Sequence, residues 1–209
     1  MRIETEPGIE VPLRHVAGPK ETGKAKRLLL AVEGSGEPAA ETLARRLARP
    51  DDAVYVLEPR GIGATRWTRK NPPNYVERSH VLLGRTVDTG RIRDVIAAAR
   101  YLHARGEGKV AVHVLGEGGA GLLAAYAALW EPEIAGVTLR RPPVTHMDDA
   151  APVLLNVLRV CDVPAVLGML APRPLAVHGV GDEAMEKVAA IYAAAGAAET
   201  FRCEPPMKE

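Results

Sequence analysis

Short apolar runs alternate with amphipathic, helix-like segments along most of this 209-residue chain. Residues 27–32 (RLLLAV) are the first such run, and residues 38–48, which contain ETLARRLA, follow as a helix pattern. Because parallel strands need crossover helices on the faces of their sheet, the alternation predicts an α/β fold, a three-layer sandwich with a mostly parallel sheet. Further strands are predicted at 53–57, 109–115, 133–139, 174–177 and 199–203, and helices at 88–104, 122–129, 183–195 and, in one or two short pieces, 151–170.

We expect residues 1–209 to form a single domain, because the length suits one core. Residues 1–24 are expected to be a lead-in with an antiparallel edge strand at 8–16. Residues 65–85 are polar, carry prolines and have no regular period, which predicts an excursion over the surface. Residues 140–170 are expected to form a loop followed by the short helices.

Charge and hydropathy exclude several classes of function. Lysine plus arginine number 27 against 26 acidic residues, so no long-range field attracts nucleic acid or an acidic membrane, and neither is expected as a partner. No apolar run approaches the roughly 20 residues of a membrane helix. The first residues lack the apolar core of a signal peptide, so we expect a soluble protein, cytoplasmic by default unless the chain is cut from a secreted one.

The cysteine pattern gives no metal site. Cys161 and Cys203 are far apart, and no Cys/His cluster has zinc spacing. Two free thiols are the favoured prediction, with one disulfide as the alternative. We expect no metal and no cofactor.

Four segments follow one another along the chain: Arg60-Gly61-Ile62-Gly63, the helix pattern 93–102, the glycine run 116–121 (GEGGAG) and 171–182 (APRPLAVHGVGD). In this order they resemble motifs of the α/β-hydrolase superfamily. The resemblance runs from about residue 25 to the end of the chain, and it implies a minimal version of that fold. The Asp162-Val163-Pro164 step is similar to acetyl xylan esterase-like and dienelactone-hydrolase-like proteins. This resemblance implies a small ester or a carbohydrate ester as the ligand.

The resemblance places a nucleophile elbow, the G-x-S-x-G turn of these enzymes, at residues 116–120. The matching residues are Gly116-Glu117-Gly118-Gly119-Ala120, so Gly118 stands where the nucleophile is expected. Glycine has no side chain with which to attack a carbonyl. Gly34 and Ser35 fall in the turn where relatives build part of the oxyanion hole, although Ser35 also suits a turn-stabilising role.

The other two members of a catalytic triad differ in how well they match. Asp182 follows the predicted strand 174–177 as the catalytic acid would, with an N-cap of the next helix as its alternative role. The histidine is expected after the last strand, but none of the six histidines comes after His178. Ser79 and His80 are adjacent, which is a poor geometry for a nucleophile and its base.

Two residues could replace the missing groups. Glu117 could act as nucleophile or base, or be a surface or capping glutamate. His146 could pair with Asp148 or Asp149 as a base, or form half of a metal site with Asp182; its alternative is a solvated loop histidine. His113 and His178 alternate within strands and are predicted to be core or near-core histidines with satisfied hydrogen bonds.

The glycine run also fits the dinucleotide motif G-x-G-x-x-G, between a strand and a helix. The acidic residue expected after the next strand is replaced by Arg140-Arg141, which could suit a phosphate. Three hypotheses therefore stay open. The chain is a non-catalytic hydrolase-fold domain that binds, dimerises or packs against another domain; or an active hydrolase of small acyl esters, with an unorthodox nucleophile or with a C-terminal histidine absent from this sequence; or a dinucleotide-binding domain.

Overall fold

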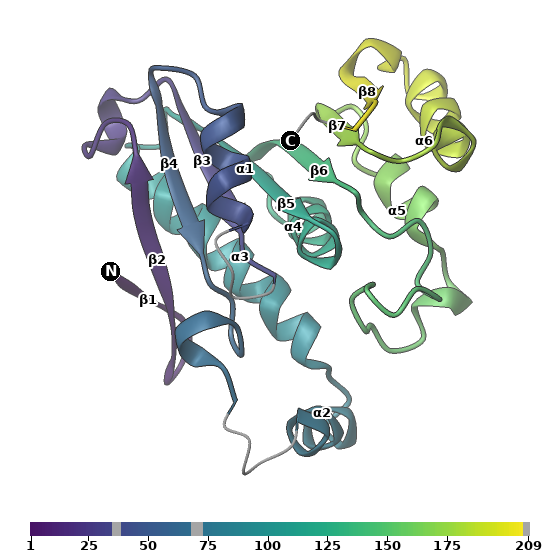
Figure 1. Cartoon of the computed structure of the whole chain (residues 1–209), viewed down its shortest axis with the longest axis horizontal. Helices are drawn as coiled ribbons and strands as arrows, with labels where there is room; N and C mark the ends of the chain where they lie inside the picture. The colour runs from purple at the N-terminus through teal and green to yellow at the C-terminus, as the bar shows by residue number, and fades with distance from the viewer. Residues whose placement is uncertain (35–38, 68–72, 207–209) are drawn as a thin grey trace.

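An eight-stranded sheet forms the centre of the computed structural model, which describes residues 1–34, 39–67 and 73–206. The strand order is β1-β2-β4-β3-β5-β6-β7-β8 (Figure 1). Strands β3 to β8 pair in parallel, and β2 runs antiparallel to both β4 and β1. The α/β class with a mostly parallel sheet is therefore confirmed. The strands are β1 (Arg2–Glu6), β2 (Ile9–Ala17), β3 (Arg27–Val32), β4 (Asp52–Leu57), β5 (Ala111–Glu117), β6 (Ile134–Arg140), β7 (Leu175–His178) and β8 (Phe201–Glu204).

The predicted antiparallel strand at 8–16 exists as β2, but it is not the edge of the sheet. Strand β1 pairs with its outer side, with Ile3 opposite Val11. Strand β1 is hard to recognise from the sequence, because Ile3 is the one buried residue among its five positions. Polar residues on both faces are typical of an edge strand, and they hide the alternation by which a strand is recognised.

Helices cover the two faces of the sheet unequally. Helix α1 (Ala39–Leu47) packs on β3, β4 and β5, with Leu43 and Ala44 in a small apolar cluster. The larger cluster lies on the opposite face under α3 (Val87–Arg105), α4 (Gly119–Trp130), α5 (Val163–Gly168) and α6 (Asp182–Ala194). In Figure 1, α1 lies in front of the sheet, and α3 and α4 lie behind it.

The segment expected to be aperiodic contains a helix, α2 (Pro73–Leu82). A proline in the first helical turn costs nothing, because its missing N–H would have had no partner inside the helix. The periodicity gave no signal because the apolar side chains do not point into a core. Leu82 is 87% exposed, Leu83 just after the helix is 78% exposed, and Tyr75 is 63% exposed.

Local side-chain contacts fix the helices that surround the candidate site. Thr86 caps α3, since its hydroxyl accepts a hydrogen bond from the Thr89 N–H while Thr89 bonds back to Thr86. Asp162 caps α5 by accepting from the Val163 N–H at 2.8 Å. Cys161 and Cys203 are free thiols, as favoured. Within the described ranges we find no helix with the length and apolarity needed to span a membrane.

Candidate functional site

The turn from β5 into α4 has the backbone of a nucleophile elbow. Gly118 adopts φ 56° and ψ −134°, a region that residues with a Cβ rarely enter. Its N–H donates to the Arg140 carbonyl at 2.9 Å, and its own carbonyl accepts from the Gly121 N–H at 3.1 Å. Chain neighbours aside, no atom of the described residues lies within 4 Å of the position where a Cβ would stand. The turn therefore presents open space where an active relative would carry its nucleophile.

Close packing explains the other glycines of the elbow. A Cβ on Gly116 would come within 2.7 Å of the Gly121 backbone nitrogen, and one on Gly121 would come within 2.9 Å of the Gly116 carbonyl oxygen. A Cβ on Gly119 would collide with the carbonyl of Ala150. The run 116–121 thus has a structural reason that does not involve a dinucleotide. Dinucleotide binding itself stays a prediction.

A cavity of about 640 Å³ lies at the carboxyl edge of the sheet, against the elbow. Parts of α1, α2, α3, the elbow, the end of β6 and residues 149–153 form its walls. Open α/β sheets bind ligands at this edge, and the volume suits a small molecule. The charged side chains that line it are Glu33, Glu77, Asp88, Glu117, Asp149, Arg91, Arg140 and Arg141.

Glu117, the residue beside the elbow, is held by two arginines. Its Oε2 accepts from Arg140 Nη1 at 3.0 Å, and its Oε1 accepts from Arg141 Nε at 3.1 Å. Its side chain is 22% exposed and lies at the end of β5, so it is neither a solvent-exposed nor a helix-capping glutamate. Ion pairs on both oxygens disfavour attack on a carbonyl, because the lone pairs are already engaged.

Glu33 occupies the turn after β3, where relatives place part of the oxyanion hole. Its carboxylate accepts from the N–H of Gly34 at 3.0 Å and from the N–H of Ala40, in α1, at 3.3 Å. Glu33 is 4% exposed, so the Gly34 donor is already used by a buried anion. In the sequence, the signal that indicates Glu33 is a carboxylate directly after an apolar strand. Ser35 lies outside the described residues.

His146 does not reach the elbow. Its Nε2 lies 2.8 Å from the Tyr126 hydroxyl, and its Nδ1 lies 3.3 Å from the Pro152 carbonyl oxygen. Burial raises the pKa of the Tyr126 phenol, with the nearby Cys161 and Asp162 adding to the shift, so Tyr126 is a hydrogen-bond donor. With the phenol donating to Nε2, the Nδ1–H faces the Pro152 carbonyl. Tyr126 lies eight residues along α4 from Gly118, which is about 12 Å of helix at 1.5 Å per residue.

The predicted partners of His146 lie elsewhere. No contact joins the described His146 ring to Asp148 or Asp149, and His146 is half-buried rather than solvated. Within the described ranges no three His, Cys, Asp or Glu side chains gather to hold a metal, so the half-site with Asp182 is not assembled.

Asp182 is exposed and is the first residue of α6, but it is not the N-cap. Gly181 holds the N-cap position, without a side-chain hydrogen bond. The predicted cap role of Asp182 is therefore wrong by one residue, because the chain turns at the Gly179–Gly181 segment before the helix begins. Burial, together with a hydrogen bond and the charge of Asp182, raises the pKa of the Cys203 thiol.

His178 and Glu204 end the neighbouring strands β7 and β8. His178 is buried, and its Nδ1 lies 3.4 Å from Glu204 Oε2 without forming a hydrogen bond. The prediction of satisfied hydrogen bonds is therefore wrong for this atom. His113 is half-buried over Gly136, and burial, followed by the charges of Arg27 and Arg49, lowers its pKa to about 4.

Ser79 and His80 do not form a pair. Each side chain bonds to the backbone of its own helix, Ser79 to the Tyr75 carbonyl and His80 to the Val76 carbonyl, both at 2.8 Å.

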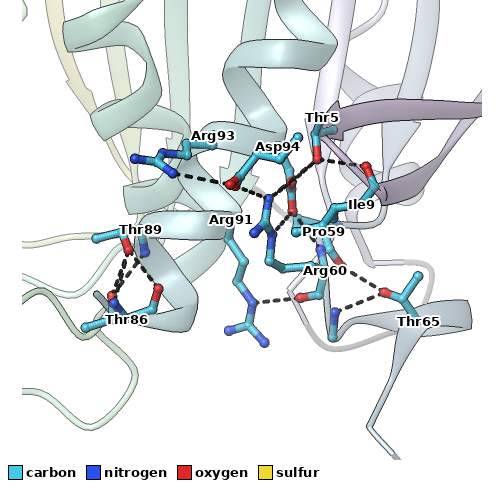
Figure 2. A network of polar contacts seen from close by, with 12 residues as sticks. Thr5, Ile9, Pro59, Arg60, Thr65, Thr86, Thr89, Arg91, Arg93 and Asp94 are labelled. Carbon is cyan, nitrogen blue, oxygen red and sulfur yellow. Dashed lines mark hydrogen bonds and ion pairs between the residues drawn. The ribbon is translucent and has the colours of Figure 1, made fainter. Parts of the chain in front are cut away.

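The Arg60-Gly61-Ile62-Gly63 turn is held by a buried ion pair, shown in Figure 2. Asp94 of α3 is fully buried and accepts from Arg60 Nε at 3.0 Å, from Nη2 at 2.6 Å and from the backbone N–H at 2.9 Å. Thr5 of β1 donates to Asp94 at 2.6 Å, and Glu6 pairs with Arg60 at 2.7 Å. The cluster joins β1, the turn after β4 and α3. No local spacing in the sequence indicates this cluster, because its members come from three separate elements.

The same cluster connects to the cavity wall. Arg91 Nε donates to the Arg60 carbonyl at 3.1 Å, and Arg91 Nη1 donates to Asp88 at 2.9 Å. Asp88 in turn accepts from the Val153 N–H at 2.7 Å. A fixed polar chain therefore positions one side of the cavity.

Solved structures resemble this arrangement, although no family model and no curated protein sequence matches the chain. A proposed acetyl xylan esterase of Bacteroides fragilis aligns with a TM-score of 0.75 at 12% identity, over 98% of this chain and 64% of that one. TT1662 of Thermus thermophilus gives 0.67 at 18% identity, over 98% and 87%. An esterase of Pyrococcus furiosus gives 0.66 at 15% identity, over 99% and 80%. The chain thus spans less than two thirds of the Bacteroides protein, and at these identities the likeness concerns the fold.

Proposed function

We propose a function for this chain from the premise that it has the α/β-hydrolase fold, which its strand order and its structural neighbours share. The chain is a non-catalytic domain of carboxylic-ester hydrolase lineage, similar to the acetyl xylan esterases. It binds a small ligand, such as an ester or a carbohydrate ester, in the cavity beside the elbow and does not cleave it.

The elbow at Gly118 is the observation that carries this proposal. The strained backbone and the open space of a nucleophile position are both present, while the residue itself has no reactive atom. A lineage that lost its nucleophile and kept its fold would retain such a turn.

The replacements considered for the nucleophile support the same proposal. Glu117 is neutralised by Arg140 and Arg141. His146 is hydrogen-bonded to Tyr126, and Tyr126 lies two turns of α4 from the elbow. A general base must come within hydrogen-bond reach of the proton that it removes, and His146 is held away from that position.

The test is hydrolysis of p-nitrophenyl acetate by the purified chain, beside Glu117→Gln and His146→Ala. The proposal expects all three proteins to match the background rate of an unrelated protein at equal concentration. Saturable turnover by the wild type that is lost in one variant would overturn it and would identify the residue that replaces the nucleophile.

An active esterase that uses Glu117 is the second candidate, because this carboxylate lies in the cavity at the end of the elbow strand. It requires Arg140 and Arg141 to release Glu117 when an ester binds. The measurement above separates the two candidates. A thermal shift with NAD or NADP would test the dinucleotide prediction, since a ligand that binds only the folded state raises Tm.

Self-association or packing against another domain is also proposed, from the exposed apolar side chains Leu82, Leu83 and Val160. Light scattering across a concentration series would measure the mass in solution. A monomer at every concentration would contradict a homodimer.

A further inference from the structure

A second cavity adjoins the one beside the elbow. The second cavity measures about 440 Å³ and lies between α2, the start of α3 and Val153. Four residues, Glu77, Asp88, Arg91 and Val153, line both cavities. A ligand can therefore occupy the two spaces at once, and the two spaces differ in chemistry.

The second cavity is largely apolar. Val81, Leu82, Val87 and Val153 supply its walls. Leu82 is 87% exposed and Val153 is 63% exposed, although neither is needed to fill the core. Burying such surface against a hydrocarbon chain is favourable, at roughly 25 cal/mol per Å² of apolar area removed from water.

The charges around the first cavity are not balanced. Its three arginines are engaged: Arg140 and Arg141 hold Glu117, and Arg91 holds Asp88. Glu77 and Asp149 also line it, and in the described part of the chain neither forms an ion pair or a hydrogen bond. The free charges facing the first cavity are therefore negative.

Arg78 is the counter-argument, because it lines the second cavity without an ion pair among the described residues. It does not line the first cavity. A cationic head group in the first cavity faces Glu77 and Asp149, and its apolar chain passes Arg78 without carrying charge there. An anionic head group would have to lie the other way round, with its charge at Arg78.

We propose that the joined cavities bind a primary aliphatic amine, with the ammonium group at Glu77 and Asp149 and the hydrocarbon chain against Val81, Leu82 and Val153. The proposal rests on the non-catalytic binding function and assigns to the same cavity an amine in place of the ester suggested above. An alkylammonium ion is fully charged at neutral pH, with a pKa near that of lysine. No covalent step is involved.

The experiment is isothermal titration of the full chain with n-butylamine, n-hexylamine and n-octylamine at pH 7, beside n-octanoate and n-octanol. We expect the affinity for amines to rise about two- to fourfold for each added methylene, which is the gain for a partly to fully buried group. Octanoate should bind more weakly than octylamine. Equal or tighter binding of octanoate, no dependence on chain length, or no binding at all would overturn the proposal.

Matched variants locate the two ends of the ligand. Glu77→Gln and Asp149→Asn should each weaken octylamine binding about two- to fivefold and leave octanol unchanged, while Glu183→Gln on α6 should change neither. Leu82→Ser should weaken all the octyl ligands, whereas Val160→Ser, at an equally exposed residue outside both cavities, should not. The changes at Leu82, Glu77 and Asp149 all affect exposed side chains, so they leave the core intact.

Failure of this proposal is distinguishable from failure of the function on which it rests. Turnover of p-nitrophenyl acetate would overturn the non-catalytic function whatever the titration shows. If p-nitrophenyl acetate is not turned over and octanoate binds more tightly than octylamine, only the amine proposal is overturned.

Discussion

Two turns at the carboxyl edge of the sheet keep their shape by opposite means. The turn after β4 is held by side chains, with Arg60 clamped by the buried carboxylate of Asp94. The turn after β5 is held by backbone contacts, with Gly116 and Gly121 so close that neither tolerates a Cβ. The first turn would fail if its charges were changed. The second depends on no side-chain contact at residue 118, although a residue with a Cβ would be strained at the positive φ of this position.

If the nucleophile has been lost, as proposed above, this difference explains how the turn kept its shape. The geometry at Gly118 is imposed by β5 and α4 packing around it, and a residue there points into open space. Selection on packing alone would preserve the turn. The reacting side chain can then be lost without a cost to folding, which the following changes test.

The largest expected effect is at the turn after β4. Asp94→Ala leaves the Arg60 guanidinium, which is 10% exposed, without its main partner. Breaking a buried pair from one side costs about 3–5 kcal/mol of unfolding free energy. Urea denaturation measures it, with Asp51→Ala as control, because the exposed Lys26–Asp51 pair is worth less than about 1 kcal/mol. A similar small loss in both variants would show that side chains do not hold this turn.

The next effect is at the elbow. Gly116→Ala forces a methyl group against the backbone of Ala120 and Gly121, at 2.7 Å from each, and should lower the unfolding free energy by about 1–3 kcal/mol. Gly23→Ala is the matched change, because its Cβ meets only a Glu107 side-chain oxygen at 4.0 Å, and it should stay within about 0.5 kcal/mol of the wild type. If Gly116→Ala is equally harmless, the close packing of β5 and α4 does not define the elbow.

The two regions should also differ in their pH dependence. His113, in β5, has a pKa of about 4 against an ordinary 6.5, so between these values the unfolded chain binds a proton that the folded chain does not. This difference has no effect on stability above pH 6.5, and as the pH falls to about 4 it lowers the unfolding free energy by about 3 kcal/mol, at roughly 1.4 kcal/mol per pKa unit. Although burial raises the pKa of Glu6, its hydrogen bond and ion pair with Arg60 hold it below the ordinary 4.5, so the turn after β4 weakens only at lower pH.

Chemical denaturation at several pH values checks this separation. His113→Gln should flatten the dependence between pH 6.5 and 4, whereas His80→Gln, on the surface helix, should leave it as in the wild type. An unchanged slope in His113→Gln would mean that other groups cause it.

The smallest effect is expected at Glu117. Its ion pairs with Arg140 and Arg141 are half-exposed, so Glu117→Gln should cost about 0.5–1 kcal/mol, in the range of screened pairs. Thermal unfolding in low and high salt measures it, and the difference between wild type and variant should shrink as salt rises. A loss as large as that of Asp94→Ala would make the elbow as dependent on side chains as the turn after β4.

The fold could be predicted where burial leaves a pattern. The run 27–32 is fully buried apart from Arg27 and became β3 at the predicted residues. Strand β1 and helix α2 could not be predicted in this way, because β1 buries only Ile3 completely and α2 leaves Leu82 in solvent. Without a buried face, neither the two-residue nor the 3.6-residue period is visible.

The position of the candidate site could be predicted from the sequence, but the contacts of its side chains could not. The glycine run correctly indicated a strand-to-helix turn at Gly118, since its geometry depends on local residues. The partners of Glu117 come from β6, and Tyr126, which binds His146, lies 20 residues before it in the sequence. Such pairings depend on strand order and on the path of the 144–153 segment, which no local spacing encodes.

The most direct test of the account is alkylation of a Gly118→Cys variant in which Cys161 and Cys203 are replaced by serine. With open space around its side chain and the N-terminus of α4 beside it, the new thiol should react with iodoacetamide in the folded protein at least as fast as in the urea-unfolded chain. That result would show an elbow that still presents a side chain for chemistry. Protection by more than about tenfold in the folded state, at unchanged stability, would show a side chain turned inward and would contradict the account.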